Sequence, residues 1–178
     1  MARCLIVGCG CRGLALAGAL RERGHAVRGT TRDPARADEL RGAGVEPFVG
    51  DPDRVATLVP AFAQVAVTCV LLGSATADPR ALAALHTTRL AMLLEKMIDT
   101  TSRGIVYEAA GTVDAQLLAG GAERVRHACA RSLIPFALLE VAPETGEAAG
   151  WTAARTAAWT AAAAAAVDEV LLGAQPAP

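Results

Sequence analysis

The chain has 178 residues, which is long enough for one domain with a substantial buried core. Its formal net charge of −1 gives no reason to expect nucleic acid or an anionic membrane as a partner. The cysteines number five, an odd count, and Cys9 and Cys11 flank a glycine, so we expect reduced thiols and a cytoplasmic protein.

An apolar stretch near the N-terminus leads into closely spaced glycines. Residues 4–7 have strand character, and Gly8, Gly10 and Gly13 follow with the spacing G-x-G-x-x-G at the start of an amphipathic helix that runs to about Arg23. This strand–turn–helix context is typical of dinucleotide-binding domains. We expect Gly8 to permit a tight turn, Gly10 to let the backbone approach a pyrophosphate, and Gly13 to let the helix pack closely on the strand. The phosphates would then bind unpaired N–H groups at the positive end of the helix.

The remainder of the chain alternates between predicted strands and predicted helices. Three Asp-Pro pairs, at Asp33, Asp51 and Asp78, predict helix starts with the aspartate as N-cap. We expect strands at residues 26–30, 45–49, 65–72, 104–108 and 133–141, and helices from residue 34 and at 53–63, 80–97, 123–132 and 152–172. Such alternation requires a parallel sheet with right-handed crossovers. The predicted fold is therefore α/β: a Rossmann-type, doubly wound sheet of about six strands in the order 3-2-1-4-5-6, with helices on both faces.

The last predicted helix is rich in alanine. It contains Arg155 and closes on Asp168 and Glu169, so we do not expect it to cross a membrane. No linker or repeat interrupts the chain, and we expect residues 1–172 to form a single domain and residues 173–178 to form a loose tail.

The residues after the second strand indicate which dinucleotide binds. NAD-specific domains place an acidic residue there, which binds the ribose 2′-OH. This chain has Thr31 and Arg32 instead, with Arg12 in the glycine loop and Arg36 in the next helix. One guanidinium group can donate two parallel hydrogen bonds to phosphate oxygens, so the three arginines favour NADP(H) over NAD(H). For Arg32 or Arg36 alone, the alternative is a solvated surface arginine. Asp33 is the counterargument, but its better role is that of a helix cap.

Four stretches of the chain resemble the short-chain dehydrogenase/reductase superfamily, in particular its extended and atypical branches, which include NAD-dependent epimerase/dehydratase and NmrA-like proteins. They are residues 7–13, 24–34, 49–52 with the strand that ends at Leu72-Gly73, and 104–107. The resemblance implies that Asp51 contacts the adenine and that the backbone of Gly73, Ser74 and Ala75 lies on the ribose and nicotinamide side. It also implies a truncated relative, since larger members continue into a substrate-binding lobe, and a homodimer through the helix at 80–97.

The chain departs from this superfamily in the residues that carry its chemistry. The superfamily's reductases and epimerases use a Tyr-x-x-x-Lys pair to exchange a proton with the substrate. Here Tyr107 is the one tyrosine, Gly111 stands four residues later, and Lys96 is the one lysine. The remaining catalytic candidates are Glu108 and Glu140, each at the end of a predicted strand, and Thr112, near the position of the superfamily's serine.

We therefore expect a domain that binds or senses NADP(H) without the standard proton transfer. The alternative is an NADPH-dependent oxidoreductase or epimerase-like enzyme that uses a different acid or base, or a partner chain that supplies the missing lobe. We predict no metal site, since Cys9 and Cys11 lack a second pair at zinc spacing. The predicted cofactor-binding residues are Gly8, Gly10, Cys11, Arg12, Gly13, Thr31, Arg32, Arg36, Asp51, Gly73 and Ser74.

Overall fold

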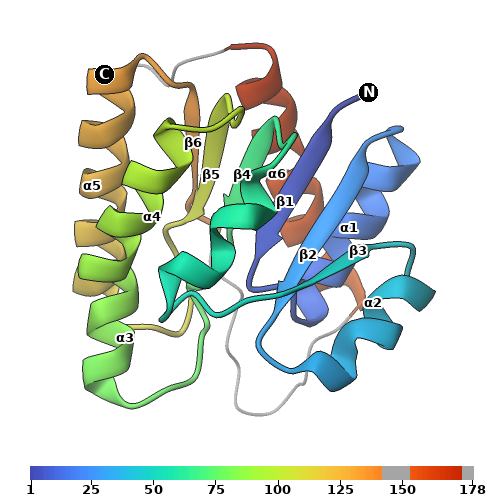
Figure 1. The fold of residues 1–178 in the computed structure, drawn as a ribbon, viewed down its shortest axis with the longest axis horizontal. Coiled ribbons are helices and arrows are strands. Elements are labelled where there is room, and N and C mark those ends of the chain that lie inside the picture. The colour runs from blue at the N-terminus through green and yellow to red at the C-terminus, as the bar shows by residue number, and fades with distance from the viewer. Residues whose placement is uncertain (142–152, 174–178) are drawn as a thin grey trace.

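Six short strands form one parallel sheet within residues 1–141 and 153–173, which the computed structural model describes (Figure 1). Their order, β3-β2-β1-β4-β5-β6, confirms the predicted Rossmann-like fold. The strands are β1 (Arg3–Val7), β2 (Ala26–Thr31), β3 (Glu46–Val49), β4 (Val67–Val70), β5 (Gly104–Glu108) and β6 (Phe136–Leu139).

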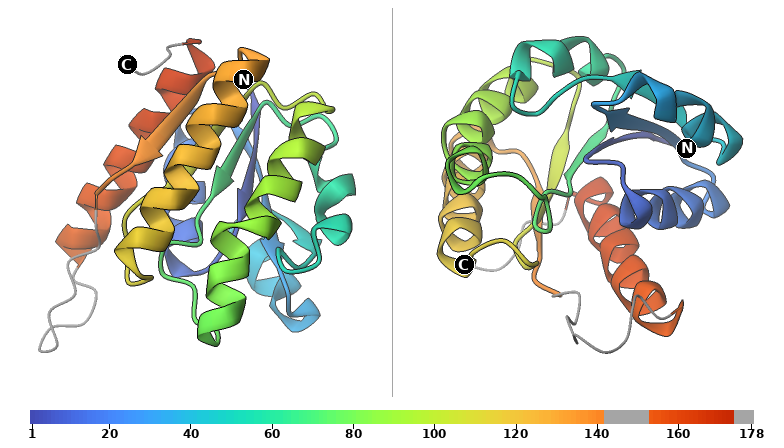
Figure 2. Two further views of the ribbon diagram at one scale, coloured as in Figure 1. Left: turned by 90° about the vertical axis from the view of Figure 1, so that its left-hand side faces the viewer. Right: turned by 90° about the horizontal axis from the view of Figure 1, so that it is seen from below.

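Helices cover both faces of this sheet (Figure 2). Residues of α1 (Cys11–Glu22), α2 (Ala37–Gly42) and α6 (Ala153–Leu171) pack into the apolar core on one face. The core on the other face is built by the 3-10 helix η2 (Val55–Phe62) with α3 (Pro79–His86), α4 (Thr88–Ile98) and α5 (Ala115–Ser132). A short 3-10 helix, η1 (Pro34–Arg36), precedes α2. None of the described helices is both long enough and apolar enough to span a membrane.

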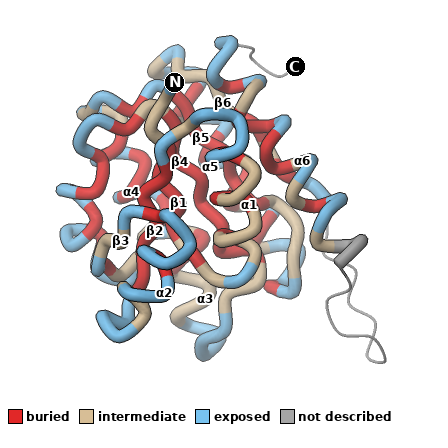
Figure 3. The backbone as a smooth tube through the Cα atoms, turned by 90° about the vertical axis from the view of Figure 1, so that its right-hand side faces the viewer, coloured by how far each residue is buried: buried red, intermediate tan, exposed pale blue. Residues whose placement is uncertain are grey.

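Alternate residues of β1 supply the two cores, because successive side chains of a strand point to opposite faces. Cys4 and Ile6 pack with α1 and α6, while Leu5 and Val7 pack with the helices of the other face, and all four are fully buried. Figure 3 shows the same burial along the neighbouring strands β4 and β5. A strand that is covered on both faces has an unbroken apolar sequence, which explains why residues 4–7 of β1 could be predicted as a strand.

The predicted single helix at residues 80–97 is wrong. Two helices, α3 and α4, meet at Thr87, whose backbone angles of φ −121° and ψ −92° are not helical. The Thr87 hydroxyl donates to the carbonyl of Ala83, 2.6 Å away, and a side chain bonded in this way competes with the helical ladder.

One of the three Asp-Pro predictions is also wrong. Asp33 and Asp78 cap η1 and α3 by accepting from backbone N–H groups of the first turn, as predicted. Asp51 instead accepts from the backbone N–H of Asp53 at 3.0 Å, which closes a local turn. The helix that follows, η2, starts only at Val55 and is 3-10 rather than α.

Helix α5 begins well before the predicted residue 123. Asp114 caps it by accepting from the N–H groups of Gln116 and Leu117. The helix ends at Ser132, and the left-handed φ of +54° at its C-cap, Leu133, is not a strand conformation, so β6 is shorter than the predicted 133–141. Of the predicted tail, residues 174–178 lie outside the described residues.

Candidate dinucleotide-binding site

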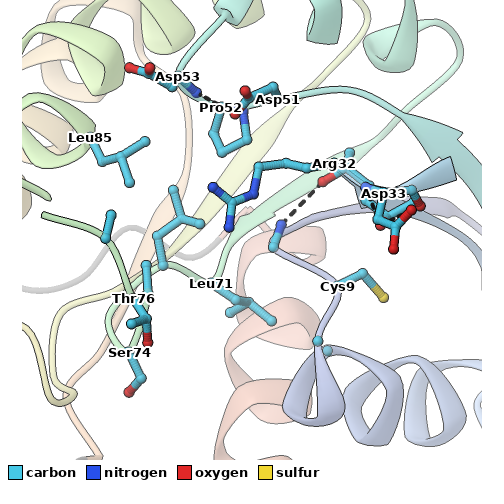
Figure 4. A pocket seen from close by; sticks show the side chains of 18 of the residues that line it. Cys9, Arg32, Asp33, Asp51, Pro52, Asp53, Leu71, Ser74, Thr76 and Leu85 are labelled. Atoms are coloured by element: carbon cyan, nitrogen blue, oxygen red, sulfur yellow. Dashed lines mark hydrogen bonds between the residues drawn. The ribbon is translucent and has the colours of Figure 1, made fainter. Parts of the chain in front are cut away.

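A pocket of about 520 Å³ lies at the carboxyl edge of the sheet, where the strand order reverses between β1 and β4. The loops after β1, β2, β3 and β4 all contribute to its wall (Figure 4). This is the position where doubly wound sheets bind ligands. Its lining includes these predicted cofactor-binding residues: Gly8, Gly10, Cys11, Arg12, Gly13, Thr31, Arg32, Arg36, Asp51 and Ser74.

The three glycines of the first loop each occupy a position that suits the predicted role. Gly8 has a left-handed φ of +87°, and a Cβ there would lie 2.6 Å from the carbonyl oxygen of Leu71. A Cβ on Gly13 would lie 3.2 Å from the side chain of Ile6, so the helix packs closely on β1. At Gly10 a Cβ would meet no atom within 4 Å. The loop is therefore tightly packed at both ends and open at its centre.

The N-terminus of α1 starts at this open centre. Among the residues that the structure describes, no side chain caps this end, and its first turn contains no acidic residue. Helix N-termini carry partial positive charge and N–H groups that bind anions. The open loop and the uncapped helix end together fit the pyrophosphate of a dinucleotide.

The three arginines predicted to bind a 2′-phosphate all line the pocket but do not converge. Arg32 extends into the pocket, between the loop after β3 and Leu71 (Figure 4). Arg36 donates two hydrogen bonds to Glu39, of 2.9 and 3.0 Å, and a longer one to the carbonyl of Cys9. The guanidinium of Arg12 pairs instead with Glu108, which is 96 residues away in the sequence. Arg32 is thus the arginine placed at the end of β2 with its charge directed into the pocket.

The residues around Arg32 are held by local hydrogen bonds. Thr31, which is buried, donates its hydroxyl to the Asp33 carbonyl and accepts from the Asp33 N–H, both at 3.1 Å. The Asp33 carboxylate accepts from Ala35 as the cap of η1, and in Figure 4 it points away from the Arg32 guanidinium. The one carboxylate near the end of β2 therefore has the capping role that the sequence predicted.

The loops after β3, β4 and β5 place the other predicted residues. The backbone N–H of Asp51 donates to the hydroxyl of Thr57 at 2.8 Å. Ser74 accepts from the backbone N–H of Thr112 at 3.3 Å, which brings the loop after β5 against the loop after β4. The Gly73 amide donates to Glu108 at 2.7 Å and does not form part of the pocket lining.

The two acidic catalytic candidates lie in opposite environments. Glu108 is fully buried, and its two carboxylate oxygens accept from Arg12 and from the Gly73 amide. Burial raises the pKa of Glu108, and the charge of Arg12 opposes that rise. The side chain of Glu140 is 71% exposed and lies 3.9 Å from Arg126. Neither carboxylate lines the pocket.

Tyr107 lies in the core rather than at the pocket. It is 1% exposed, and its hydroxyl lies 2.7 Å from Nδ1 of the equally buried His86. Burial raises the pKa of Tyr107 well above its usual range and lowers the pKa of His86. A Cβ on Gly121 of α5 would lie 2.0 Å from the tyrosine hydroxyl, so this glycine makes room for the pair. Lys96 lies on α4 beside Glu95.

Acid should destabilise the protein through His86, because its pKa is lower in the folded state than in the unfolded one. As pH falls below about 6.5, the unfolded chain takes up this proton first, and stability falls by up to about 1.4 kcal/mol per pH unit until the folded pKa is reached. Between pH 7.5 and 5.5, we expect urea unfolding to show a larger loss of stability for the wild type than for His86→Gln. The two proteins differ only at residue 86, so an equal loss in the two would contradict this assignment.

The apolar wall of the pocket was not predicted from sequence. Leu71, Leu72 and Leu85 line it together with Thr76 and Ala77, which lie between β4 and α3. By residue type alone, apolar side chains that line a pocket at a strand end cannot be distinguished from those of the core. The only feature of the sequence that indicates this wall is the length of the segment between β4 and α3. Within the described part of the chain, no three His, Cys, Asp or Glu residues are grouped to hold a metal ion.

Comparison with known proteins identifies the family. The model of the TrkA-N domain family matches residues 4–104, more than half of the chain, from β1 to the start of β5. The chain belongs to the TrkA-N domain family. A search of curated protein sequences gave no match for this TrkA-N domain.

Solved structures similar to this TrkA-N domain confirm the predicted resemblance at the level of the fold. A short-chain dehydrogenase/reductase superfamily protein from Agrobacterium tumefaciens with bound NAD has a TM-score of 0.63 at 21% identity, covering 78% of this chain and 48% of that one. The Citrobacter sp. triphenylmethane reductase complexed with NADP(H) has a TM-score of 0.60 at 19% identity, covering 77% and 48%. The UDP-glucose 4-epimerase from Bifidobacterium longum, in complex with NAD+ and UDP, has a TM-score of 0.65 at 13% identity, covering 78% and 52%. The chain thus spans about half the length of these proteins.

Proposed function

We propose that this TrkA-N domain binds NADP(H) and that Arg32 binds the 2′-phosphate. The observation that carries the proposal is the position of Arg32, at the end of β2 with its side chain in the pocket. The carboxylate that follows, Asp33, is engaged as the cap of η1. A guanidinium in this place favours a phosphorylated ribose, whereas NAD-specific domains have an acidic residue there.

The other pocket residues would hold the remaining parts of the dinucleotide. The loop from Gly8 to Gly13 and the start of α1, with Cys11 and Arg12, would bind the pyrophosphate. By the resemblance to the short-chain dehydrogenase/reductase superfamily, Asp51 would contact the adenine, and Gly73 and Ser74 would lie on the nicotinamide side. Bound NADPH would supply the hydride of any reduction, and these residues would bind and orient it. Arg36 is a weaker candidate because Glu39 already neutralises it.

Proteins with this fold bind either coenzyme. The Agrobacterium tumefaciens structure has bound NAD, and the Citrobacter sp. reductase is complexed with NADP(H). The fold alone therefore does not select between them, and the proposal depends on the side chains that follow β2.

We propose binding or sensing of the coenzyme in preference to catalysis by the Tyr-Lys mechanism. Tyr107 lies on strand β5 and is buried against His86, whereas Lys96 lies on helix α4. The alternative, an oxidoreductase that uses Glu108, Glu140 or Thr112, has less support. Glu108 has no access to the pocket, Glu140 lies outside it, and the Thr112 contact to Ser74 is made by its backbone.

Three further expectations stay predictions: a single domain over residues 1–172, a cytoplasmic location and a homodimer through α3 and α4. The dimer is implied only by the resemblance to the superfamily; a groove of about 620 Å³ lies between α4 and α5. Its apolar wall is formed by Ala91, Leu94, Ile98 and Ala128.

Calorimetric titration with NADPH and NADH tests the proposed function. We expect NADPH to bind at least about 10-fold more tightly than NADH, which corresponds to about 1.4 kcal/mol. Incubation of the complex with a panel of carbonyl compounds should produce no oxidation of NADPH. Absence of heat with both coenzymes would overturn the proposal, and turnover of a carbonyl compound would favour the oxidoreductase alternative.

A further inference from the structure

Glu108 connects three successive strand ends at the carboxyl edge of the sheet. The residue ends β5, and its side chain reaches the loop after β4 and the helix that follows β1. One carboxylate oxygen accepts from the Gly73 amide at 2.7 Å, and the other accepts from the Arg12 guanidinium. Arg12 and Ser74, the residue after Gly73, both line the pocket. The carboxylate therefore lies behind the pocket and joins two segments of its wall.

Close packing around Gly73 supports this bridging position. A Cβ on Gly73 would lie 2.9 Å from Cγ of Glu108 and 2.8 Å from the Ala110 carbonyl oxygen. A Cβ on Gly111 would lie 1.9 Å from the carbonyl oxygen of Gly73. The two glycines thus allow the loops after β4 and β5 to approach closely enough for the Glu108 carboxylate to reach the Gly73 amide.

The Arg12 guanidinium is also held from α6. It lies 5.2 Å from the centre of the Trp159 ring, and Trp159 is 1% exposed. A cation over an indole face is stabilised by the ring, and more strongly where water is excluded. Glu108 and Trp159 together therefore fix the direction of the Arg12 side chain at the start of α1.

A fully buried carboxylate with both oxygens engaged is suited to holding other groups in place. A general acid or base must reach the reacting atom in a substrate pose, and Glu108 does not line the pocket. A buried charge is tolerated when it is paired and hydrogen-bonded, as it is here.

We propose that Glu108 is a positioning residue of the dinucleotide site: through Arg12 and the Gly73 amide it fixes the start of α1 relative to the loop after β4. This inference rests on the proposed function, because the two segments are those that would hold the pyrophosphate and the nicotinamide side of NADP(H). It assigns Glu108 to coenzyme binding and removes it from the catalytic candidates.

The test compares Glu108→Gln with Glu140→Gln, in which the same change is made at an exposed glutamate directly after the adjacent strand β6. We expect the Kd for NADPH, measured by calorimetry, to rise at least about 10-fold in E108Q and to stay unchanged in E140Q. Without coenzyme, hydrogen exchange at the Gly73 amide and in the first turn of α1 should be faster in E108Q only. Equal Kd values or equal exchange rates in the two variants would overturn the inference.

A double-mutant cycle separates positioning from a general loss of stability. If Glu108 acts through Arg12, E108Q should add no more than about twofold to the Kd of Arg12→Gln, because the two residues form one unit. If the fold-change in Kd of the double variant equals the product of the two single-variant fold-changes, the inference is contradicted. In E108Q the Arg12 guanidinium loses its carboxylate partner, and the double variant removes this unpaired charge as well. The double variant therefore remains testable if E108Q alone fails to fold. If wild type binds neither coenzyme, the proposed function fails, and the exchange comparison alone still decides whether Glu108 fixes the two segments.

Discussion

Replacing Arg32 by alanine should weaken NADPH binding about 10- to 100-fold and change NADH binding by less than about threefold. A hydrogen bond to a charged group contributes about 1.5–3 kcal/mol, and 1.4 kcal/mol corresponds to a factor of ten in Kd. Only NADPH carries the 2′-phosphate, so only its binding should lose this interaction. Arg32 is exposed, and surface substitutions of this kind usually change stability by less than about 0.5 kcal/mol.

Arg36→Ala is the matched control for this measurement. Arg36 also lines the pocket, but both of its hydrogen bonds to Glu39 would have to change before it could bind a phosphate. We therefore expect a smaller loss of NADPH affinity than for R32A, in calorimetric titrations at one fixed salt concentration. Equal losses of NADPH and NADH affinity in R32A would show that Arg32 does not recognise the 2′-phosphate.

The features that sequence predicted correctly depend on short-range rules. The strand order follows from alternation of strands and helices, and the caps at Asp33 and Asp78 follow from contacts within one turn. The position of Gly8 in a left-handed conformation follows from the tight turn that leaves β1. The caps and the turn involve residues that are neighbours in the chain, and the strand order follows from the succession of strands and helices along it.

The features that sequence missed depend on partners far away in the chain. Arg12 seemed equivalent to Arg32 because both lie near the predicted phosphate positions, yet Arg12 pairs with Glu108 across the ends of three strands. The start of α5 was missed because Gly120 and Gly121 interrupt a helical pattern. Gly121 is required there by the hydroxyl of Tyr107, a contact that only the folded chain reveals.

The buried Tyr107 and the buried Glu108 show why residue type alone did not locate the chemistry. They are neighbours at the end of β5, and their side chains point to opposite faces, as strand geometry requires. The Tyr107 side chain reaches His86, the last residue of α3, and the Glu108 side chain reaches Arg12 on α1. Both are therefore committed to internal contacts, and the pocket keeps the residues of a binding site without a proton donor of the superfamily's usual kind.

The largest effects should come from adding one methyl group to the glycine loop, with opposite results at two positions. Gly10→Ala should fold with a loss of about 1 kcal/mol or less, since its φ of −85° suits alanine and the Cβ meets no atom within 4 Å. The same methyl group would occupy the space that a pyrophosphate needs. Steric overlap between this methyl group and the pyrophosphate should cost about 3 kcal/mol. Because both coenzymes carry the pyrophosphate, we expect the affinities for NADPH and NADH to fall together, by about 100-fold or more.

Gly8→Ala should instead destabilise the fold. Its φ of +87° is unfavourable for a residue with a Cβ, and that Cβ would lie 2.6 Å from the backbone oxygen of Leu71. Conformational strain of about 1–2 kcal/mol and a steric cost of about 1–3 kcal/mol predict a total loss of about 2–5 kcal/mol in urea unfolding. Wild-type coenzyme affinity in G10A would place the pyrophosphate elsewhere, and wild-type stability in G8A would contradict the tight turn. The pair separates the two functions of the loop, because one methyl group tests only the ligand and the other tests only the backbone.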